Sequence, residues 1–459
     1  MYYAETLKLP KEFKVYIKND LKVVNPAFRE AAKANRSTKG IKSELNFYTE
    51  TKDYIEVPRM YRNNAIPMDN LIDATTWANP KDHLEFAAGK TLRENQSKAM
   101  EAIIDANGNL IIEMPTGSGK TVTGISAITH FKRRALVLVH KKSLMNQWKE
   151  AFNEFSNAKV GLLGSGKMEI SEQYDVVIAT VQSIQPYHKK KYTQLVEADF
   201  FNSFDVVIVD EAHNFSAETF YQCISKFPAK IRIGFSATAF RNDGLDFVFK
   251  LCIGKPFKIE MEQEIKPKIW ECYTGWEDRT HSFYNRRNAN LATALTKMTQ
   301  DSYRNKMLYR CLNTMGKNDR KTLFLTCRVD HARMFYKNMV KLFPKKEVCL
   351  LIGASKDEER QKAKTADFVF ATYGVAKEGV DLPLLDTLIF ATPIAGRSGV
   401  IQAVGRLTRK KEGKNENVDV YDFIDDSKVF KAFFYKRRVV YSEMGLESNR
   451  LNMKRLKWI

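Results

Sequence analysis

Residues 114–121 combine the chemical groups that bind the phosphates of a nucleotide. They follow an apolar run and read Met114, Pro115, Thr116, Gly117, Ser118, Gly119, Lys120 and Thr121. In such a loop, backbone N–H groups and the dipole of the next helix attract phosphate oxygens, while the lysine reaches the outer phosphates and the threonine hydroxyl ligates Mg²⁺. We therefore predict that Pro115–Thr121 bind ATP, with Lys120 catalytic and Thr121 a metal ligand. Met114 replaces the first glycine of the usual pattern, so the loop alone leaves an ordinary strand–turn–helix open.

A pair of carboxylates ends another apolar run of the chain. Asp210 and Glu211 directly follow the valine- and isoleucine-rich residues 206–209. A carboxylate in this place can hold Mg²⁺ beside the phosphates, and the next one can orient and deprotonate the attacking water. We predict that Asp210 is a metal ligand and that both residues are catalytic. The alternative is an acidic helix cap. It is the weaker reading, because the loop and this strand follow the order that nucleotide hydrolases use.

Mainly apolar, strand-like runs alternate with helical patterns in two parts of the chain. The runs occupy residues 135–139, 176–180, 206–210 and 231–235 in the first part, and 321–326, 348–352, 368–372 and 387–391 in the second. Apolar runs of this length are typical of parallel strands covered on both faces, and their alternation with helices indicates doubly wound sheets. We predict an α/β fold with two tandem domains, at residues 86–275 and 276–435.

The two ends of the chain are basic. Residues 1–85 predict a small α+β domain with a linker, including strands at 11–18, 47–48 and 54–58 and a helix at 26–33. Its interleaved lysines, arginines and aromatics suit binding to a nucleic-acid backbone; alternatively, the aromatics form the core of the domain. Residues 436–459 predict a basic helical tail, which either extends the nucleic-acid track or packs on the second domain.

The composition favours a polyanionic partner. The 459 residues include 74 Lys and Arg against 54 Asp and Glu, a net charge of +20. Such an excess suggests nucleic acid, with a solvated basic surface as the alternative. The six scattered cysteines form no zinc-binding or disulfide pattern, and no apolar run reaches membrane-spanning length. We expect a cytoplasmic protein without membrane contact.

Further motifs, in a fixed order, resemble those of superfamily 2 helicases and translocases over residues 90–425. Asp210-Glu211-Ala212-His213 resembles the DEAH box, and Ser236-Ala237-Thr238 resembles the element that couples hydrolysis to movement. Residues 371–381 and 402–409 resemble motifs five and six of the family. Single motifs are weak signals, whereas their order is specific. The resemblance implies two RecA-like domains.

The resemblance also assigns roles to individual residues. Arg93 and Gln96 would recognise adenine, and Gly379 and Asp381 would face the nucleotide. Motif six supplies the remaining catalytic residues Gln402, Arg406 and Arg409. The two arginines would stabilise charge on the γ-phosphoryl group, because a planar guanidinium does so bidentately. Hydrolysis would then require the two domains to close, which would couple it to movement on a strand.

Contacts with nucleic acid are implied at the edges of both predicted sheets. By the resemblance, His140, Lys141, Thr180 and Gln182 would track a strand, and Thr372 would contact a phosphate. The basic run that contains Lys189, Lys190 and Lys191 suggests a loop at a duplex junction. A solvated surface connection explains that run equally well.

The combined prediction is an ATP-dependent DNA helicase or translocase whose ATPase is stimulated by DNA. The short basic N-terminal domain makes the chain resemble phage UvsW-type branch-migration helicases and XPB/RecG-type enzymes. This resemblance implies a monomer with 3′-to-5′ polarity that remodels forks and Holliday junctions in replication, recombination and repair, in the host cytoplasm if phage-encoded.

Several alternatives remain at this point. One is an RNA helicase, since the motifs do not show whether a 2′-OH is read. Another is a motor that translocates without separating strands, including the motor of a restriction system, although no nuclease-like carboxylate cluster is present. The third is a non-catalytic nucleic-acid-binding module, against which the complete set of predicted catalytic residues argues.

Overall fold

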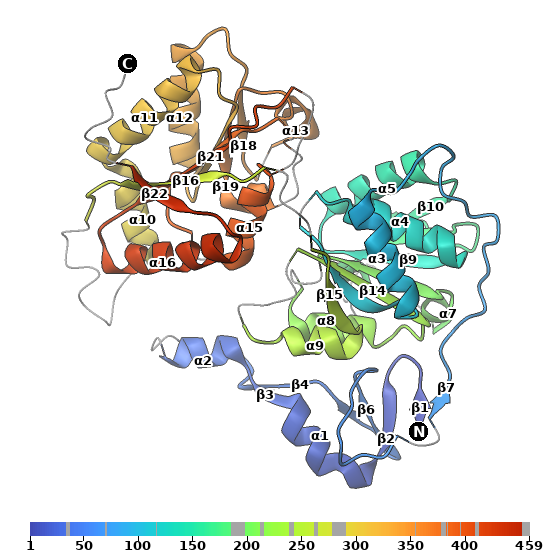
Figure 1. Ribbon diagram of the computed structural model, residues 1–459. Helices are drawn as coiled ribbons and strands as arrows, with labels where there is room; N and C mark the ends of the chain where they lie inside the picture. The colour runs from blue at the N-terminus through green and yellow to red at the C-terminus, as the bar shows by residue number, and fades with distance from the viewer. Residues whose placement is uncertain are drawn as a thin grey trace. The chain divides into compact units, whose positions relative to one another are not determined.

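The computed structural model describes most of the chain, in two compact units. The described residues are 1–33, 37–68, 71–115, 117–184, 198–211, 215–237, 243–260, 265–277, 291–353, 355–377, 382, 384–394, 396–408 and 413–451. The first unit is Met1–Met261 and the second is Glu262–Ile459. In Figure 1 the first unit runs from blue to green and the second from yellow to red.

The first unit begins with a small α+β domain. Its elements are β1 (Tyr2–Tyr3), β2 (Leu7–Pro10), η1 (Lys11–Phe13), α1 (Lys14–Leu21), β3 (Lys22–Val24), α2 (Pro26–Lys33), β4 (Glu44–Asn46), β5 (Thr49–Glu50), β6 (Tyr54–Val57) and β7 (Ile72–Asp73). A 5-stranded sheet has the order β5-β6-β2-β1-β7, and β3 pairs separately with β4. The predicted helix at 26–33 is confirmed, as is the strand predicted at 54–58, which ends at Val57. The strand predicted at 47–48 is wrong, because these residues connect β4 to β5.

The strand predicted at residues 11–18 is wrong, because this segment is helical. Ile17 and Leu21 are fully buried, whereas Val15 is 66% exposed. The buried positions are therefore four residues apart, as on one face of a helix, and the period-two alternation of the sequence is coincidental. The 3₁₀ turn η1 follows Pro10, whose fixed φ suits the residue before a helical turn.

A mostly parallel sheet forms the centre of the first unit. Its 8 strands have the order β11-β10-β12-β9-β13-β14-β8-β15, and only β11 runs antiparallel to its neighbour. The elements are α3 (Glu94–Asp105), β8 (Asn109–Glu113), α4 (Lys120–Phe131), β9 (Ala135–Val139), α5 (Lys142–Phe155), β10 (Val160–Gly164), β11 (Lys167–Met168), β12 (Val176–Thr180), α6 (Val181–Ile184), α7 (Ala198–Asn202), β13 (Val206–Asp210), α8 (Ala217–Ile224), β14 (Ile231–Ser236), α9 (Asp246–Cys252) and β15 (Lys255–Lys258). The strands predicted in this part are confirmed.

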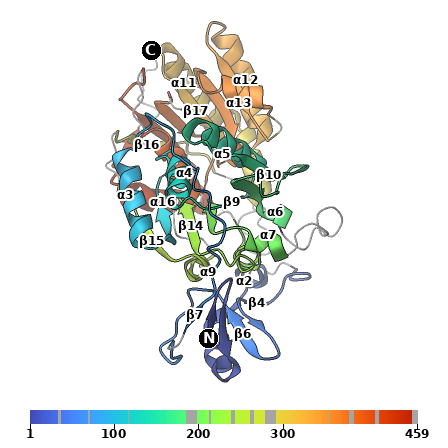
Figure 2. The same cartoon turned by 90° about the vertical axis from the view of Figure 1, so that its right-hand side faces the viewer.

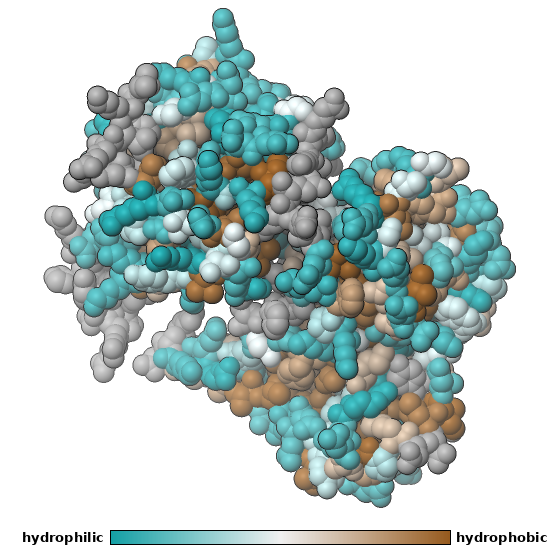
Figure 3. Space-filling view, in the orientation of Figure 1, coloured by the Kyte–Doolittle hydropathy of each residue, from teal (hydrophilic) through white to brown (hydrophobic). Residues whose placement is uncertain are grey.

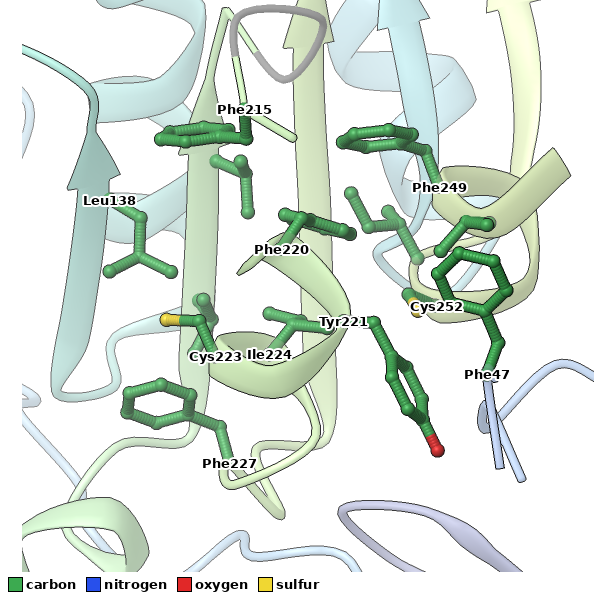
Figure 4. Packing of buried hydrophobic residues seen from close by; sticks show 14 of the residues in the cluster. Phe47, Leu138, Phe215, Phe220, Tyr221, Cys223, Ile224, Phe227, Phe249 and Cys252 are labelled. Atoms are coloured by element: carbon green, nitrogen blue, oxygen red, sulfur yellow. The ribbon is translucent and has the colours of Figure 1, made fainter. Parts of the chain in front are cut away.

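The two faces of this sheet have different covers. Residues of α3, α4 and α5 share one hydrophobic cluster with the strands, and Figure 2 labels these three helices. Residues of α8, α9 and the small domain share the other cluster. In Figure 4, Ile224 and Cys223 of α8 lie over the sheet, while Tyr221 extends toward Phe47 of the small domain. The rings of Phe47 and Tyr221 meet edge to face with centroids 5.8 Å apart.

Two buried arginines join the small domain to the first sheet. Arg59, fully buried, donates hydrogen bonds to the carbonyl oxygens of Ala229 and Lys230. Arg232 donates from the sheet to the carbonyl oxygen of Glu5, at 2.8 Å. Because a buried guanidinium is costly without such partners, these bonds fix the orientation of the small domain. The small domain is therefore a fixed part of the first unit.

The second unit contains a fully parallel sheet. Its 7 strands have the order β18-β19-β17-β20-β21-β16-β22. The elements are β16 (Lys268–Tyr273), α10 (Leu291–Gln300), α11 (Ser302–Lys317), β17 (Thr322–Thr326), α12 (Val329–Leu342), β18 (Val348–Leu351), α13 (Asp357–Lys362), β19 (Phe368–Thr372), α14 (Tyr373–Lys377), β20 (Thr387–Phe390), α15 (Arg397–Gly405), β21 (Asp419–Ile424), α16 (Lys428–Glu443) and β22 (Ser448–Leu451). Side chains of α11 and α12 share one hydrophobic cluster with the strands, and those of α15 and α16 share another. Figure 1 shows the two helix pairs on opposite faces of the sheet.

The boundaries of the second unit differ from the expected ones. β16 precedes the expected boundary at residue 276, yet it pairs with β21 and β22. The expected start of a basic tail at residue 436 falls inside α16. In that helix Arg437 is buried and donates from Nη2 to Asp422 Oδ1 at 2.7 Å, whereas Lys436 and Arg438 are exposed. This part of the tail therefore packs on the second sheet.

Figure 3 shows hydrophilic side chains over most of the displayed face, with hydrophobic ones in scattered patches. Among the described residues, no helix has the length and apolar composition that crossing a membrane requires.

His331 makes the stability of the second unit depend on pH. Its Nδ1 lies 2.9 Å from Thr326 Oγ1 and its Nε2 lies 3.0 Å from Asn305 Oδ1. Burial, and secondarily the charge of Arg304, lowers the pKa of His331 to about 3. The unfolded chain binds this proton near pH 6.5, whereas the folded chain does not bind it until about pH 3. The contribution of His331 to stability is therefore intact above pH 6.5 and is lost as the pH falls below it.

We expect the unfolding free energy of the second unit to fall more steeply with acid in the wild type than in His331→Gln. The difference between pH 6.5 and pH 5 should be about 2 kcal/mol, from about 1.4 kcal/mol per pH unit. The unfolding free energy is measured by urea unfolding of both proteins at the two pH values, with hydrogen exchange of the β17 amides as the probe of the second unit. Identical pH dependence in the two proteins would contradict the assignment.

Candidate active site

The predicted phosphate loop lies between β8 and α4. Gly117 has φ 81° and Gly119 has φ 91°, conformations that L-residues with side chains rarely adopt. The Ser118 hydroxyl donates to the Pro115 carbonyl oxygen at 2.7 Å and closes the turn. Gly119 is the N-cap of α4 and has no side chain to bond the first N–H groups. These N–H groups and the helix dipole are therefore available to an anion.

The carboxyl ends of three strands bring the loop and the two carboxylates together. In the sheet, β13 pairs with β14 and β14 pairs with β8. Asp210 stands opposite Phe235, and Ser236 stands opposite Glu113, just before the loop. The strands are parallel, so the loop, Asp210 and Glu211 lie at one edge of the sheet. This is the edge at which open α/β sheets bind ligands.

Lys120 and Glu211 form a buried ion pair at this edge. Lys120 Nζ lies 2.7 Å from Glu211 Oε1. It also lies 3.5 Å from the Met114 carbonyl oxygen. Glu211 holds a left-handed backbone conformation, with φ 49°. Strained residues of this kind cluster at functional sites. The ammonium that is predicted to bind phosphate therefore contacts the predicted general base, and phosphate would compete for it.

Asp210 is held by a tryptophan. Trp148 Nε1 donates to Asp210 Oδ2 at 2.8 Å. Burial, followed by the charge of Glu211, raises the pKa of Asp210 to about 6, while Lys120 and Trp148 act in the opposite direction. A buried carboxylate with a raised pKa gains from a nearby cation. A carboxylate and the Thr121 hydroxyl are oxygen ligands of the kind that Mg²⁺ takes together with ATP phosphates, so these residues fit the predicted metal.

The first turn of α3 packs against the phosphate loop. Gln96 Oε1 accepts from the Arg93 backbone N–H at 2.8 Å, and Gln96 Nε2 donates to the Gly119 carbonyl oxygen at 3.4 Å. A Cβ on Gly119 would lie 1.9 Å from Gln96 Nε2, so this approach requires glycine. Asn95, which the sequence analysis missed, donates to the Ser118 carbonyl oxygen at 2.8 Å. The contact of Arg93 and Gln96 with adenine stays a prediction.

The strand-tracking candidates of the first unit lie at the same edge of its sheet. Thr180 ends β12 and stands opposite Val139 of β9, which His140 and Lys141 follow. The Thr180 hydroxyl lies 2.7 Å from the Ser183 hydroxyl. Gln182 is exposed on α6. Their contacts with nucleic acid stay predictions. The remaining candidates of this unit, Thr116, Lys189, Lys190 and Lys191, lie outside the described residues.

The candidates of the second unit lie at strand and helix ends. Thr372 ends β19 and stands opposite Thr326 of β17. Gln402 and Arg406 are buried within and just after α15. Arg437 donates to the Ile394 carbonyl oxygen at 2.8 Å, and thereby fixes the segment that precedes α15. Gly379, Asp381 and Arg409 lie outside the described residues, and the roles of all these residues stay predictions.

Comparison with known proteins gives both a family match and relatives. Residues 89–241 match the model of a family described as "Type III restriction enzyme, res subunit". A candidate ATP-dependent RNA helicase of Acanthamoeba polyphaga mimivirus is 26% identical over 428 residues, which are 90% of this chain and 79% of that protein. The DNA 3′-5′ translocase XPB2 of Sulfurisphaera tokodaii is 27% identical over 202 residues, 44% of this chain and 42% of that protein.

Two solved structures are also similar. The crystal structure of T4 UvsW aligns over 96% of both chains with 17% identity and a TM-score of 0.39. S. cerevisiae Dbp5 bound to RNA and ADP BeF3 aligns over 79% of this chain and 94% of that chain, with 16% identity and a TM-score of 0.51. The Dbp5 match supports the predicted fold of two tandem RecA-like sheets. The order of the motifs, the family match and the viral helicase relatives support the assignment of this chain to the superfamily 2 helicases, with similarity to an XPB-type protein.

Proposed function

We propose that this helicase hydrolyses ATP with Mg²⁺ to move along DNA and to remodel branched DNA, with 3′-to-5′ polarity. The observation that carries the catalytic part is the convergence of Lys120, Asp210 and Glu211 at the end of the phosphate loop. The XPB2 relative, named a DNA 3′-5′ translocase, supports the substrate and the polarity. The net charge of +20 supports a polyanionic partner.

Each residue of the site has a distinct task in this proposal. The loop N–H groups and Lys120 bind the phosphates, and Asp210 and Thr121 hold Mg²⁺, which would neutralise charge on the phosphate oxygens. Glu211 orients and deprotonates the attacking water once phosphate has taken the Lys120 ammonium from it. Arg406 and Arg409, which lies three residues later in the sequence, stabilise the transition state.

The small domain contributes to DNA binding through only part of its charge. Lys14 Nζ lies 2.5 Å from Glu50 Oε1 and Lys22 Nζ lies 2.8 Å from Glu44 Oε2, so the domain neutralises several of its own lysines. Lys11 and Arg29 are exposed, and Lys18 is half-buried. Since the aromatics Phe47 and Tyr61 are buried, the reading of these two rings as core is the correct one. We propose that the exposed charges contact duplex phosphates.

An RNA helicase is the second candidate, because the mimivirus relative that matches 90% of this chain is named as an RNA helicase. Matched DNA and RNA substrates distinguish the two. ATPase stimulation and strand remodelling should be measured on single strands, forks and four-way junctions of each chemistry. Stimulation by RNA alone would overturn the DNA proposal, and equal activity on linear and branched DNA would overturn the preference for junctions.

DNA binding is expected to weaken steeply with salt. Backbone contacts release counterions, so affinity should fall on the order of 10³-fold between 50 and 200 mM KCl for about six phosphate contacts. Fluorescence anisotropy with a labelled four-way junction and a single strand of equal length measures this dependence. A flat response would show that the basic surface does not bind the backbone.

A further inference from the structure

Trp148 connects the metal-binding carboxylate to the helix of the phosphate loop. It lies on α5 and is fully buried, with its indole N–H directed at Asp210 Oδ2, 2.8 Å away. A carboxylate has two oxygens. The indole N–H bonds one of them, so the position of that oxygen depends on the tryptophan.

The opposite end of the indole is held just as closely. A Cβ on Gly124 of α4 would lie 2.6 Å from Trp148 Cη2, so the ring fills the space that a side chain would need. The same Cβ would lie 3.1 Å from Phe235, the neighbour of Asp210 in the sheet. Phe152, one turn along α5, packs against Trp148 with ring centroids 5.9 Å apart. The indole cannot tilt without a movement of α4, the helix that begins with Lys120.

We propose that Trp148 is a positioning residue of the ATP site. It fixes one oxygen of Asp210 through its N–H, and so presents the other oxygen in a constant place to the Mg²⁺ that accompanies ATP. Groups that hold a metal ligand in this way typically contribute 10–100-fold to metal affinity. The inference rests on the proposed role of Asp210 as a metal ligand.

The test is Trp148→Phe in the full chain, which keeps an aromatic ring and removes the N–H. Isothermal titration calorimetry would measure ADP binding in EDTA and across a series of Mg²⁺ concentrations. In EDTA, the variant should bind ADP with wild-type affinity. Mg²⁺ raises the affinity for ADP, and the Mg²⁺ concentration at which half of this rise is reached should be about tenfold higher in the variant. The Mg²⁺ dependence of ATP turnover should shift by the same factor and recover at high Mg²⁺.

Phe155→Leu is the matched control, because it alters an aromatic ring on the same helix that packs on Phe86 instead of Trp148, with ring centroids 6.1 Å apart. It should lower the melting temperature and leave the Mg²⁺ dependence unchanged. Gly124→Ala is a second variant, which displaces the indole without removing its N–H, and it should reproduce the Mg²⁺ shift.

Three outcomes distinguish a failure of the proposed role of Trp148 from a failure of the proposed ATP site. An unchanged Mg²⁺ dependence in both Trp148→Phe and Gly124→Ala would show that the indole only packs. An equal loss of ADP affinity with and without Mg²⁺ would place the effect on the phosphate loop and overturn the inference. Failure of the wild type to bind ADP would instead refute the proposed ATP site itself.

Discussion

Replacing Glu211 with glutamine is expected to lower ATP turnover by about 10²–10⁴-fold while ATP still binds. The amide keeps the size of the side chain but cannot take a proton from the attacking water. It also releases the Lys120 ammonium, which lies 2.7 Å from Glu211 Oε1, so affinity for ATP should stay constant or rise. Steady-state phosphate release and equilibrium binding of a labelled ATP analogue measure the two effects.

The same substitution has a predicted signature in stability. Removing one partner of a buried ion pair leaves the other charge uncompensated and typically costs about 3–5 kcal/mol. Without nucleotide, the melting temperature of Glu211→Gln should therefore drop, and ATP should restore it, because phosphate replaces the carboxylate beside Lys120. Glu101→Gln, an exposed substitution on α3, serves as the control for loss of charge. Hydrolysis that persists in both Glu211→Gln and Lys120→Ala would refute the assigned site.

Replacing Arg406 with alanine is expected to reduce ATP turnover by about 10³–10⁵-fold, the range typical of an arginine finger. Binding of ATP should change little, since the phosphate loop belongs to the first unit. Arg406→Lys should not restore turnover, because an ammonium cannot make two parallel hydrogen bonds to a phosphoryl group. Single-turnover kinetics with DNA present separates the chemical step from binding.

Arg397 provides the matched control for this experiment. It lies at the start of the same helix and its Nη2 is 2.9 Å from Glu443 Oε2 on the surface. Arg397→Ala should retain wild-type turnover. Arg406 is buried, so circular dichroism should verify that its variant folds. Wild-type turnover in a folded Arg406→Ala protein would remove this arginine from the mechanism.

The strands and the motifs could be predicted because their signals are local. The run at 135–139 is apolar throughout and the run at 206–210 is apolar up to Asp210, which is typical of strands covered on both faces, and both strands are found as predicted. Segment 11–18 was predicted as a strand because its alternation fits period two. The segment is a helix because Ile17 and Leu21 are buried together on one helix face. The sequence alone does not show which of its apolar residues become buried.

The sequence by itself singled out the candidate residues: Lys120 because it follows a glycine-rich turn at the start of a helix, and Asp210 and Glu211 because carboxylates end an apolar strand. Only the tertiary structure decided what those residues touch. The bonds from Glu211 to Lys120 and from Asp210 to Trp148 join positions 91 and 62 residues apart. The strand order of the sheet sets such contacts, because it brings distant parts of the chain to one edge. Trp148 cannot be told from other core aromatics in the sequence, and only the folded structure directs its N–H at Asp210.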